Sequence, residues 1–563
     1  MAGTTHVRIR RGQTSVDPRA RARPRMRWAA PVLLAPFFAA CGGPASSSTD
    51  PTPPAPPPSA SAVEEDFPAD ASAAHYHPMH HAAFGLVYGS GCPDNGACGC
   101  GDAQNLAEEF NCQMDRLATY DIPVSVYLFD GGAWSLGHSS PDGTCTGPDC
   151  CSWKLGDQVV QRLARDGVRG LLHFWGGCHD EGQYGRAYGR LGRNLLGFYL
   201  DDGSSDAELQ GVSEYMQSAI PGDWEVVAKA YQNREPSTTN PGLSKWANVA
   251  YVGDHVFDFE GLKESIDRLV AKAHYIPAPY AELTGYAYLD SGSPDEEVYY
   301  RRLHFGALQP VMAHTPYANS DPWRAEYSPD LVRVYRYWAW LHRELVPYFY
   351  SYAYRMYETP SLAALWRGPM TYSLRVGREL YVPVVTEPVE AMDIRLPNGE
   401  WINYWDESQL VSGTLAGYRV PLGREPVFIR QGAIIPMDVE RSYTGHGTRE
   451  SRGSLTVLVY PSGTSSFRYR EDARESWITF TSALAETELT LTADPGLPDQ
   501  PVLYRIGRWG EEPGSVGIDG PRVTVNQGGT VPRVGGEAAV NGSPQSAWSY
   551  DARARRLVIK VVP

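Results

Sequence analysis

The chain has 563 residues, of which 42% are hydrophobic and 20% charged, so it is long enough to form several folded domains. Its formal net charge of −15 argues against nucleic acid or an anionic membrane surface as the main partner. The 34 tyrosines and 15 tryptophans are a high content, and such rings either stack on sugars or fill hydrophobic cores.

The first segment with a clear pattern is "MRWAAPVLLAPFFAAC", residues 26–41. A basic start, an apolar run too short to span a bilayer and small residues at its end are typical of a secretory signal. "FAAC" followed by two glycines resembles a bacterial lipobox, which would make Cys41 the lipidated first residue of the mature chain. We therefore expect a signal peptide over 1–41 and an exported protein, held to a bacterial membrane by this lipid anchor alone. An ordinary cleaved signal, with secretion, is the alternative.

Residues 42–81 are rich in Pro, Ser and Ala and predict an extended tether. The tether ends in "HYHPMHH" (75–81), which we interpret as a solvated linker end, with metal binding as the alternative. The other eight of the nine cysteines, all except Cys41, lie between residues 92 and 178. Their even number in an exported chain favours disulfides that hold loops together, and the spacings "CGC" and "CC" suit zinc poorly.

Short apolar runs recur between residues 83 and 315, and helix-like segments separate many of them. Most runs are continuous rather than alternating, as expected for strands covered on both faces. The predicted strands cover 83–89, 123–130, 168–175, 195–202, 224–231, 247–254, 273–279 and 304–315. The predicted helices between them include 103–120, 155–167 and 259–273. This alternation predicts an α/β fold, a (β/α)8 TIM barrel that we assign to residues 82–364.

Several predicted strands end in an acid or a histidine, and the carboxyl ends of TIM-barrel strands form one mouth. These residues are Asp130, Asp201, Asp202, Asp254 and His314, and Asp290 follows the seventh strand. Two carboxylates across a cleft can break a glycosidic bond, and a retaining enzyme holds them roughly 5 Å apart. Asp201 and Asp254 end the fourth and sixth strands, near enough on the rim to share one sugar. The sequence contains no GxSxG, HExxH or P-loop motif that would favour other chemistry.

Beyond the barrel strands, residues 328–359 predict one long amphipathic helix that begins at Ser328. Extended segments and turns follow to the end of the chain. They predict two all-β sandwich domains, a proximal one over 365–440 and a distal one over 441–563.

The order of these segments resembles glycoside hydrolase family 31, the α-glucosidase and α-xylosidase family, from about residue 82 to the C-terminus. "RELVPYFYSYAYRMYETP", "YVPVVTE", "LPNGEWINYWDES" and "EPVFIRQGAIIPM" are similar, in order, to its post-barrel helix and proximal β-domain. "VYPSGTSSFRYRED" is similar to its distal β-domain. The resemblance implies a retaining α-glycosidase that requires no metal and no organic cofactor. It also implies that the family's N-terminal β-sandwich is lacking, because the tether leads almost directly into the first strand.

The resemblance assigns roles to single residues. "GFYLD" resembles the nucleophile motif and points to Asp201, and "YVGD" resembles the acid/base motif and points to Asp254. Asp202 remains the alternative nucleophile. The motifs "PVSVYLFD", "NRE", "YLDSG" and "PVMAHTPYANSDPW" resemble substrate-contacting segments and point, respectively, to Asp130, Arg234, Asp290 and His314.

Some positions depart from the family's pattern. Asp202, Gly203 and Ser204 replace its polar Asn-Glu turn, and Tyr251 and Val252 replace the Trp-Thr pair before the acid/base. The arginine that usually stands near the strand-eight histidine is not visible. We therefore predict a hydrolase acting on α-glucosides or α-xylosides of oligosaccharides. A surface carbohydrate-binding lipoprotein with a decayed site, an α-galactosidase-like enzyme and a transglycosylating enzyme are the alternatives.

Overall fold

The fold is described here from a computed structural model, which covers the chain in segments from residue 80 onwards. The described residues are 80–90, 106–129, 156–174, 181–200, 206–219, 225–229, 246–252, 255–273, 276, 278–283, 295–316, 320–358, 365–472 and 474–563. All of them belong to one unit of the chain, residues 60–563. The predicted signal peptide, Cys41 and the tether up to residue 79 lie outside the described residues.

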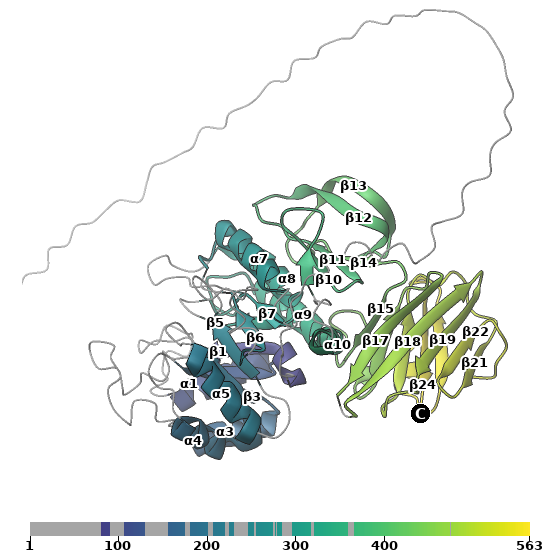
Figure 1. Ribbon diagram of the computed structural model, residues 1–563. Coiled ribbons are helices and arrows are strands. Elements are labelled where there is room, and N and C mark those ends of the chain that lie inside the picture. Colours follow the sequence, from purple (N-terminus) through teal and green to yellow (C-terminus); the bar gives the residue numbers. More distant parts are fainter. Residues whose placement is uncertain are drawn as a thin grey trace, which may run out of the picture. The chain divides into compact units, whose positions relative to one another are not determined.

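Eight parallel strands form one sheet in the order β7-β6-β5-β4-β3-β2-β1-β8 (Figure 1). They are β1 Leu86–Ser90, β2 Val126–Phe129, β3 Arg169–Phe174, β4 Leu195–Leu200, β5 Glu225–Lys229, β6 Val249–Tyr251, β7 Ala278–Tyr280 and β8 Met312–His314. The backbone N–H of Leu283, just after β7, donates to the carbonyl of Ala313 in β8 at 2.9 Å. This bond joins the two ends of the sheet, so the predicted TIM barrel is confirmed.

Helices connect the barrel strands and cover them. They are α1 Leu106–Thr119, α3 Asp157–Asp166, α4 Glu181–Leu191, α5 Asp206–Ala219, α7 Phe259–Ala273 and α8 Glu296–Ala307. Every residue of β2 and β4 is buried, which explains why these strands read as continuous apolar runs. The helix predicted over 259–273 has those bounds in the structure, because its apolar residues recur at the helical period and form its buried face.

Two predicted elements differ from the observed ones. The predicted strand 304–315 is mostly not a strand, because α8 continues to Ala307 and β8 begins only at Met312. Residues 298–307 of α8 are all buried, and a helix buried on every side gives the same continuous apolar run as a buried strand. The predicted long helix is two helices, α9 Pro329–Glu344 and α10 Val346–Glu358. The break at Leu345 comes just before Pro347, which has no N–H to donate to the preceding turn.

The C-terminal region is built of β-sheets, as predicted. The six-stranded sheet has the order β13-β12-β14-β11-β10-β9, and it is followed by two five-stranded sheets, β15-β16-β20-β24-β23 and β17-β18-β19-β22-β21 (Figure 1). The strands of the first are β9 Leu365–Arg367, β10 Ser373–Val376, β11 Leu380–Pro383, β12 Ala391–Asn403, β13 Gln409–Arg419 and β14 Phe428–Arg430. Those of the second are β15 Ile434–Met437, β16 Leu455–Val459, β20 Val502–Ile506, β23 Ala547–Asp551 and β24 Arg556–Val561. Those of the third are β17 Thr464–Glu471, β18 Ser476–Ala485, β19 Glu488–Asp494, β21 Val516–Asp519 and β22 Arg522–Val525, and the short helix α11 covers Glu537–Asn541.

The structure moves the boundary that we predicted between the two C-terminal domains. β15 falls inside the predicted proximal domain, 365–440, but it pairs with β16 of the distal domain over four residue pairs, from Ile434↔Val459 to Met437↔Thr456. The change of sheet therefore falls between β14 and β15. A turn at Gly432, which has φ +91°, separates these two strands, and the prediction passed over this signal inside "EPVFIRQGAIIPM".

The two histidines at the end of the predicted tether are part of the fold. The His80 side chain accepts from the backbone N–H of Ala82 and caps the 3-10 helix η2, His81–Phe84. Nδ1 of His81 lies 2.9 Å from the Asp472 carboxylate at the end of β17. The interpretation of residues 80 and 81 as a solvated linker end is therefore wrong. No helix within the described residues is long and apolar enough to cross a membrane.

Candidate active site at the barrel mouth

The parallel barrel brings the carboxyl ends of β2, β4 and β6 to one edge of the sheet. The predicted nucleophile follows Leu200, the last residue of β4, and the predicted acid/base follows β6 by three positions. The structure thus describes the strands that carry the predicted site. The side chains themselves, Asp130, Asp201, Arg234, Asp254 and Asp290, lie outside the described residues and stay predictions.

Aromatic side chains line the inside of the barrel just below this edge. The rings of Tyr199 in β4 and Tyr251 in β6 lie 5.9 Å apart between centroids, although β5 separates their strands. Strands in a sheet lie about 4.8 Å apart, so these two rings meet across the inside of the barrel. His173 continues the row at 4.9 Å from Tyr199, and Tyr280 continues it at 5.4 Å from Tyr251. The strand ends therefore stand above a floor of one imidazole and three phenol rings.

A buried carboxylate lies at the same mouth. Glu282, two residues beyond β7, accepts a hydrogen bond of 2.7 Å from the hydroxyl of Thr315, the residue after β8. Thr315 faces inward beside β1, because a Cβ added to Gly89 would come 2.8 Å from its hydroxyl oxygen. Glu282 is only 7% exposed. Sequence reasoning missed this acid because the predicted seventh strand stops at residue 279, and nothing in "AEL" marks the side chain as inward.

His314 does not lie where the predicted sugar contact requires. It is fully buried, and its Nδ1 lies 2.9 Å from the hydroxyl of Tyr335 in α9. Its Nε2 lies 3.5 Å from the hydroxyl of Tyr299 in α8. Burial lowers the pKa of His314 to about 3, so the ring is neutral. The prediction that His314 binds sugar is wrong for this geometry, because its side chain points out of the barrel toward the helices. The strand position was right, but the side of the sheet was not.

A second buried acid lies beside His314. Asp321, in the segment after β8, is fully buried and accepts a hydrogen bond of 2.8 Å from the hydroxyl of Tyr88 in β1. Burial raises the pKa of Asp321 to about 7, against the smaller lowering effects of the Tyr88 hydrogen bond and of Arg116 and Arg324. The Tyr88 ring packs edge-on against His314 at 5.1 Å. This cluster supports the seam between β1 and β8 from outside the barrel.

The described part of the chain also bears on metals and cysteines. No group of three or more His, Cys, Asp or Glu side chains in these segments is placed to hold a metal ion. Cys112, on α1, is the only cysteine among the described residues, and it is disulfide-bonded.

A closed parallel barrel with polar strand ends, followed by β-sheet domains, defines the class of protein as a TIM-barrel protein with C-terminal β-domains. Comparison with protein families then identifies both parts. Residues 237–352 match the glycosyl hydrolases family 31 TIM-barrel domain, and residues 356–435 match the glycosyl hydrolase family 31 C-terminal domain. Two consecutive segments of the chain thus match glycosyl hydrolase family 31, in agreement with the resemblance.

Curated relatives match over less than half of the chain. The isomaltosyltransferase of Sporosarcina globispora is 25% identical over 261 residues, which cover 42% of this chain and 24% of the relative. The α-xylosidase of Saccharolobus solfataricus is 23% identical over 254 residues, or 41% of this chain and 33% of the relative. The chain therefore spans a third or less of the length of these relatives.

Solved structures match over most of the chain. The cycloalternan-forming enzyme of Listeria monocytogenes superposes with a TM-score of 0.66 and 15% identity, covering 86% of this chain and 53% of that one. The family 31 dextranase of Flavobacterium johnsoniae gives a TM-score of 0.66 and 16% identity, covering 87% of this chain and 70% of that one. At this identity the likeness establishes the fold.

Proposed function

We propose that the chain is a retaining α-glycosidase in which Asp201 and Asp254 act on one sugar at the barrel mouth. The observation that carries the proposal is the contact between Tyr199 and Tyr251 across the barrel interior, 5.9 Å between ring centroids. It supports the proposal because the ends of β4 and β6, which lead into the two aspartates, lie close together above buried rings. Aromatic rings of this kind form apolar surfaces against which a sugar can pack.

In the proposed reaction the Asp201 carboxylate attacks the anomeric carbon while Asp254 protonates the leaving oxygen. The glycosidic bond breaks, and a bond from the sugar to Asp201 forms. Asp254 then takes a proton from water, whose oxygen attacks the same carbon and releases Asp201. The two acids need different environments, because one must be ionised while the other holds a proton. We include Glu282, which accepts a hydrogen bond from Thr315, among the residues proposed to contact hydroxyl groups of the bound sugar.

The test is turnover of aryl α-glucoside, α-xyloside and α-galactoside by the wild type and three variants. Asp201→Asn and Asp254→Asn should each lower kcat by roughly 10³-fold or more, because each removes a group that reacts in both steps. Asp202→Asn is the matched control, since it removes a neighbouring carboxylate of the same kind. Loss of activity in Asp202→Asn alone would refute the role of Asp201. Sugar binding by an inactive wild type would instead support the decayed binding protein.

Transfer of the glycosyl group to a second sugar is the other candidate reaction. It is favoured by two relatives, the isomaltosyltransferase and the 1,6-α-glucosyltransferase of Sporosarcina globispora, the latter 28% identical over 276 residues. The solved Listeria monocytogenes enzyme was determined with a pentasaccharide substrate, which supports an oligosaccharide as the ligand class. Separation of products from a malto- or isomalto-oligosaccharide distinguishes the two reactions. Products longer than the substrate indicate transfer, whereas free monosaccharide and shortened oligosaccharide without longer products indicate hydrolysis.

We also propose that the protein is exported and held to a membrane through Cys41. The lipobox-like "FAAC" supports this, and so does the disulfide-bonded Cys112, because disulfides persist in oxidising compartments. Fractionation of cells expressing the wild type and Cys41→Ser tests it. The wild type should be found with the membranes and Cys41→Ser in the soluble fraction. An equal distribution of both proteins would exclude the anchor.

A further inference from the structure

A cavity of about 660 Å³ lies where α9, the loop between β12 and β13, and the distal β-domain meet. Its lining is strongly cationic. Five arginines contribute to it, namely Arg505, Arg508, Arg553, Arg555 and Arg556. Two carboxylates, those of Asp406 and Glu407, line it as well, so guanidinium groups outnumber carboxylates. None of these residues belongs to the barrel mouth.

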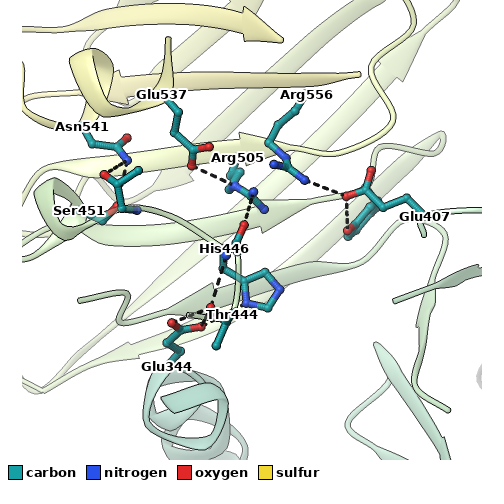
Figure 2. Close-up of polar contacts among 12 residues, drawn as sticks. Glu344, Glu407, Thr444, His446, Ser451, Arg505, Glu537, Asn541 and Arg556 are labelled. Atoms are coloured by element: carbon teal, nitrogen blue, oxygen red, sulfur yellow. Dashed lines mark hydrogen bonds and ion pairs between the residues drawn. The ribbon is translucent and has the colours of Figure 1, made fainter. Parts of the chain in front are cut away.

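Two of the arginines are held in place by the fold. Figure 2 shows Arg505 of β20 and Arg556 of β24 with their guanidinium groups between Glu537 and Glu407. Arg505 lies 3.1 Å from the Glu537 carboxylate and also donates to the backbone carbonyl of Gly445. Arg556 lies 3.3 Å from the Glu407 carboxylate. These ion pairs fix two cationic groups at the inner wall of the cavity.

Donor capacity remains after these contacts. Nε of Arg556 is buried and has no hydrogen-bond partner in the described structure. The side chains of Arg553 and Arg555, both exposed, form no hydrogen bond or ion pair with the described residues. Arg553 and Arg555 are exposed to solvent, so their guanidinium donors are free to pair with an anion that enters the cavity, and Nε of Arg556 adds a buried donor to the same lining.

The charge of the cavity also acts on its neighbours. Burial lowers the pKa of His446, and the positive charges of Arg505 and Arg556 lower it further. His446 lines the cavity and is therefore neutral, with its Nδ1 3.1 Å from the Glu344 carboxyl group. Part of the lining is aromatic and comprises Tyr337, Tyr404 and Trp405. The cavity thus combines a cationic wall with an aromatic one.

We propose that this cavity binds a sugar that carries an oxyanion, either a phosphate or a carboxylate. The planar guanidinium fork of arginine matches both groups with two parallel hydrogen bonds. The volume exceeds what one inorganic anion fills, and the aromatic wall offers apolar surface to the rest of the ligand. The oxyanion part of the proposal is independent of the barrel mouth, whereas the sugar part rests on the proposed function.

The experiment measures the thermal unfolding midpoint of the full chain with glucose 6-phosphate, glucuronate, glucose and inorganic phosphate at matched ionic strength. Glucose 6-phosphate or glucuronate should raise the Tm by roughly 2–4 °C at saturation. The shift should disappear in Arg553→Gln/Arg555→Gln. It should persist in the matched control Arg419→Gln/Arg522→Gln, which removes two exposed arginines of the β-domains that lie outside this cavity.

Three outcomes overturn the proposal. The first is the absence of any shift with the charged sugars, and the second is an equal shift in both double variants. A shift with inorganic phosphate but not with glucose 6-phosphate or glucuronate would also overturn it, because the ligand class would be wrong. A binding shift needs no turnover, so failure of this proposal and failure of the glycosidase proposal are separate results.

Discussion

Replacement of Asp321 by asparagine should abolish the pH dependence that this buried acid imposes on stability. The asparagine keeps the shape of the side chain and an acceptor for the Tyr88 hydroxyl, which lies 2.8 Å from Oδ1. It cannot ionise. Burial raises the pKa of Asp321 from 3.8 to about 7 in the folded protein. The folded state therefore favours the protonated acid more than the unfolded state does.

The sign and size of the effect follow from this difference. The stability that the protonated carboxyl contributes is fully present below pH 3.8 and is lost as the pH rises through about 7. At about 1.4 kcal/mol for each pH unit, the loss amounts to about 4 kcal/mol. Part of it is shared with Glu109, because burial and then the charge of Asp321 raise the pKa of Glu109 to about 7 as well.

The assay is urea unfolding of wild type and Asp321→Asn at intervals from pH 4 to pH 8. The two proteins should be similar in stability near pH 4, and the variant should be more stable by up to about 4 kcal/mol at pH 8. Asp519→Asn, which changes an exposed acid of β21, is the control and should follow the wild type. A difference between wild type and Asp321→Asn that stays constant across this range would refute the reasoning.

Two further predictions concern the barrel. In urea unfolding, Gly306→Ala should destabilise the protein by about 1–3 kcal/mol, because the new Cβ would lie 2.0 Å from the Leu283 side chain. Gly211→Ala is the control, since its Cβ would enter open space on α5, and it should stabilise the protein by about 0.5–1 kcal/mol. Equal effects would contradict the tight fit at Gly306. Glu282→Gln should lower kcat/KM on an aryl α-glycoside by roughly tenfold or more while leaving the Tm within a few degrees, because it weakens contacts to the sugar. Unchanged kinetics would remove Glu282 from the site.

The sequence was informative wherever burial alone decides the structure. The barrel strands could be predicted because strands covered on both faces are continuous apolar runs, and α7 because its apolar residues recur at the helical period. The break between α9 and α10 could have been predicted from Pro347. The prediction of one long helix instead followed the amphipathic pattern, which continues across the break. The start of β8 could not, because the buried helix before it is equally apolar.

The candidate site was harder to predict because it depends on which way each side chain points. His314 and Thr315 are neighbours at the end of β8, yet His314 bonds to Tyr335 on the outside while Thr315 bonds to Glu282 on the inside. Successive residues of a strand face opposite sides of the sheet. An error of one position therefore assigns to the barrel interior a side chain that in fact packs against the outer helices. Sequence patterns show where a strand ends, but they do not show which of two successive residues faces the barrel interior. That direction is set by how the strand pairs with its neighbours in the barrel.

The same parity bears on the choice between the two adjacent aspartates after β4. Tyr199 faces into the barrel, because its ring meets that of Tyr251 across the intervening strand. Side chains alternate along a strand, so a residue two positions after Tyr199 shares its direction if the extended backbone continues. That residue is Asp201, whereas Asp202 has the parity of Leu200. Alternation therefore favours Asp201 on grounds that do not depend on the family motif, and Asp202→Asn tests both arguments at once.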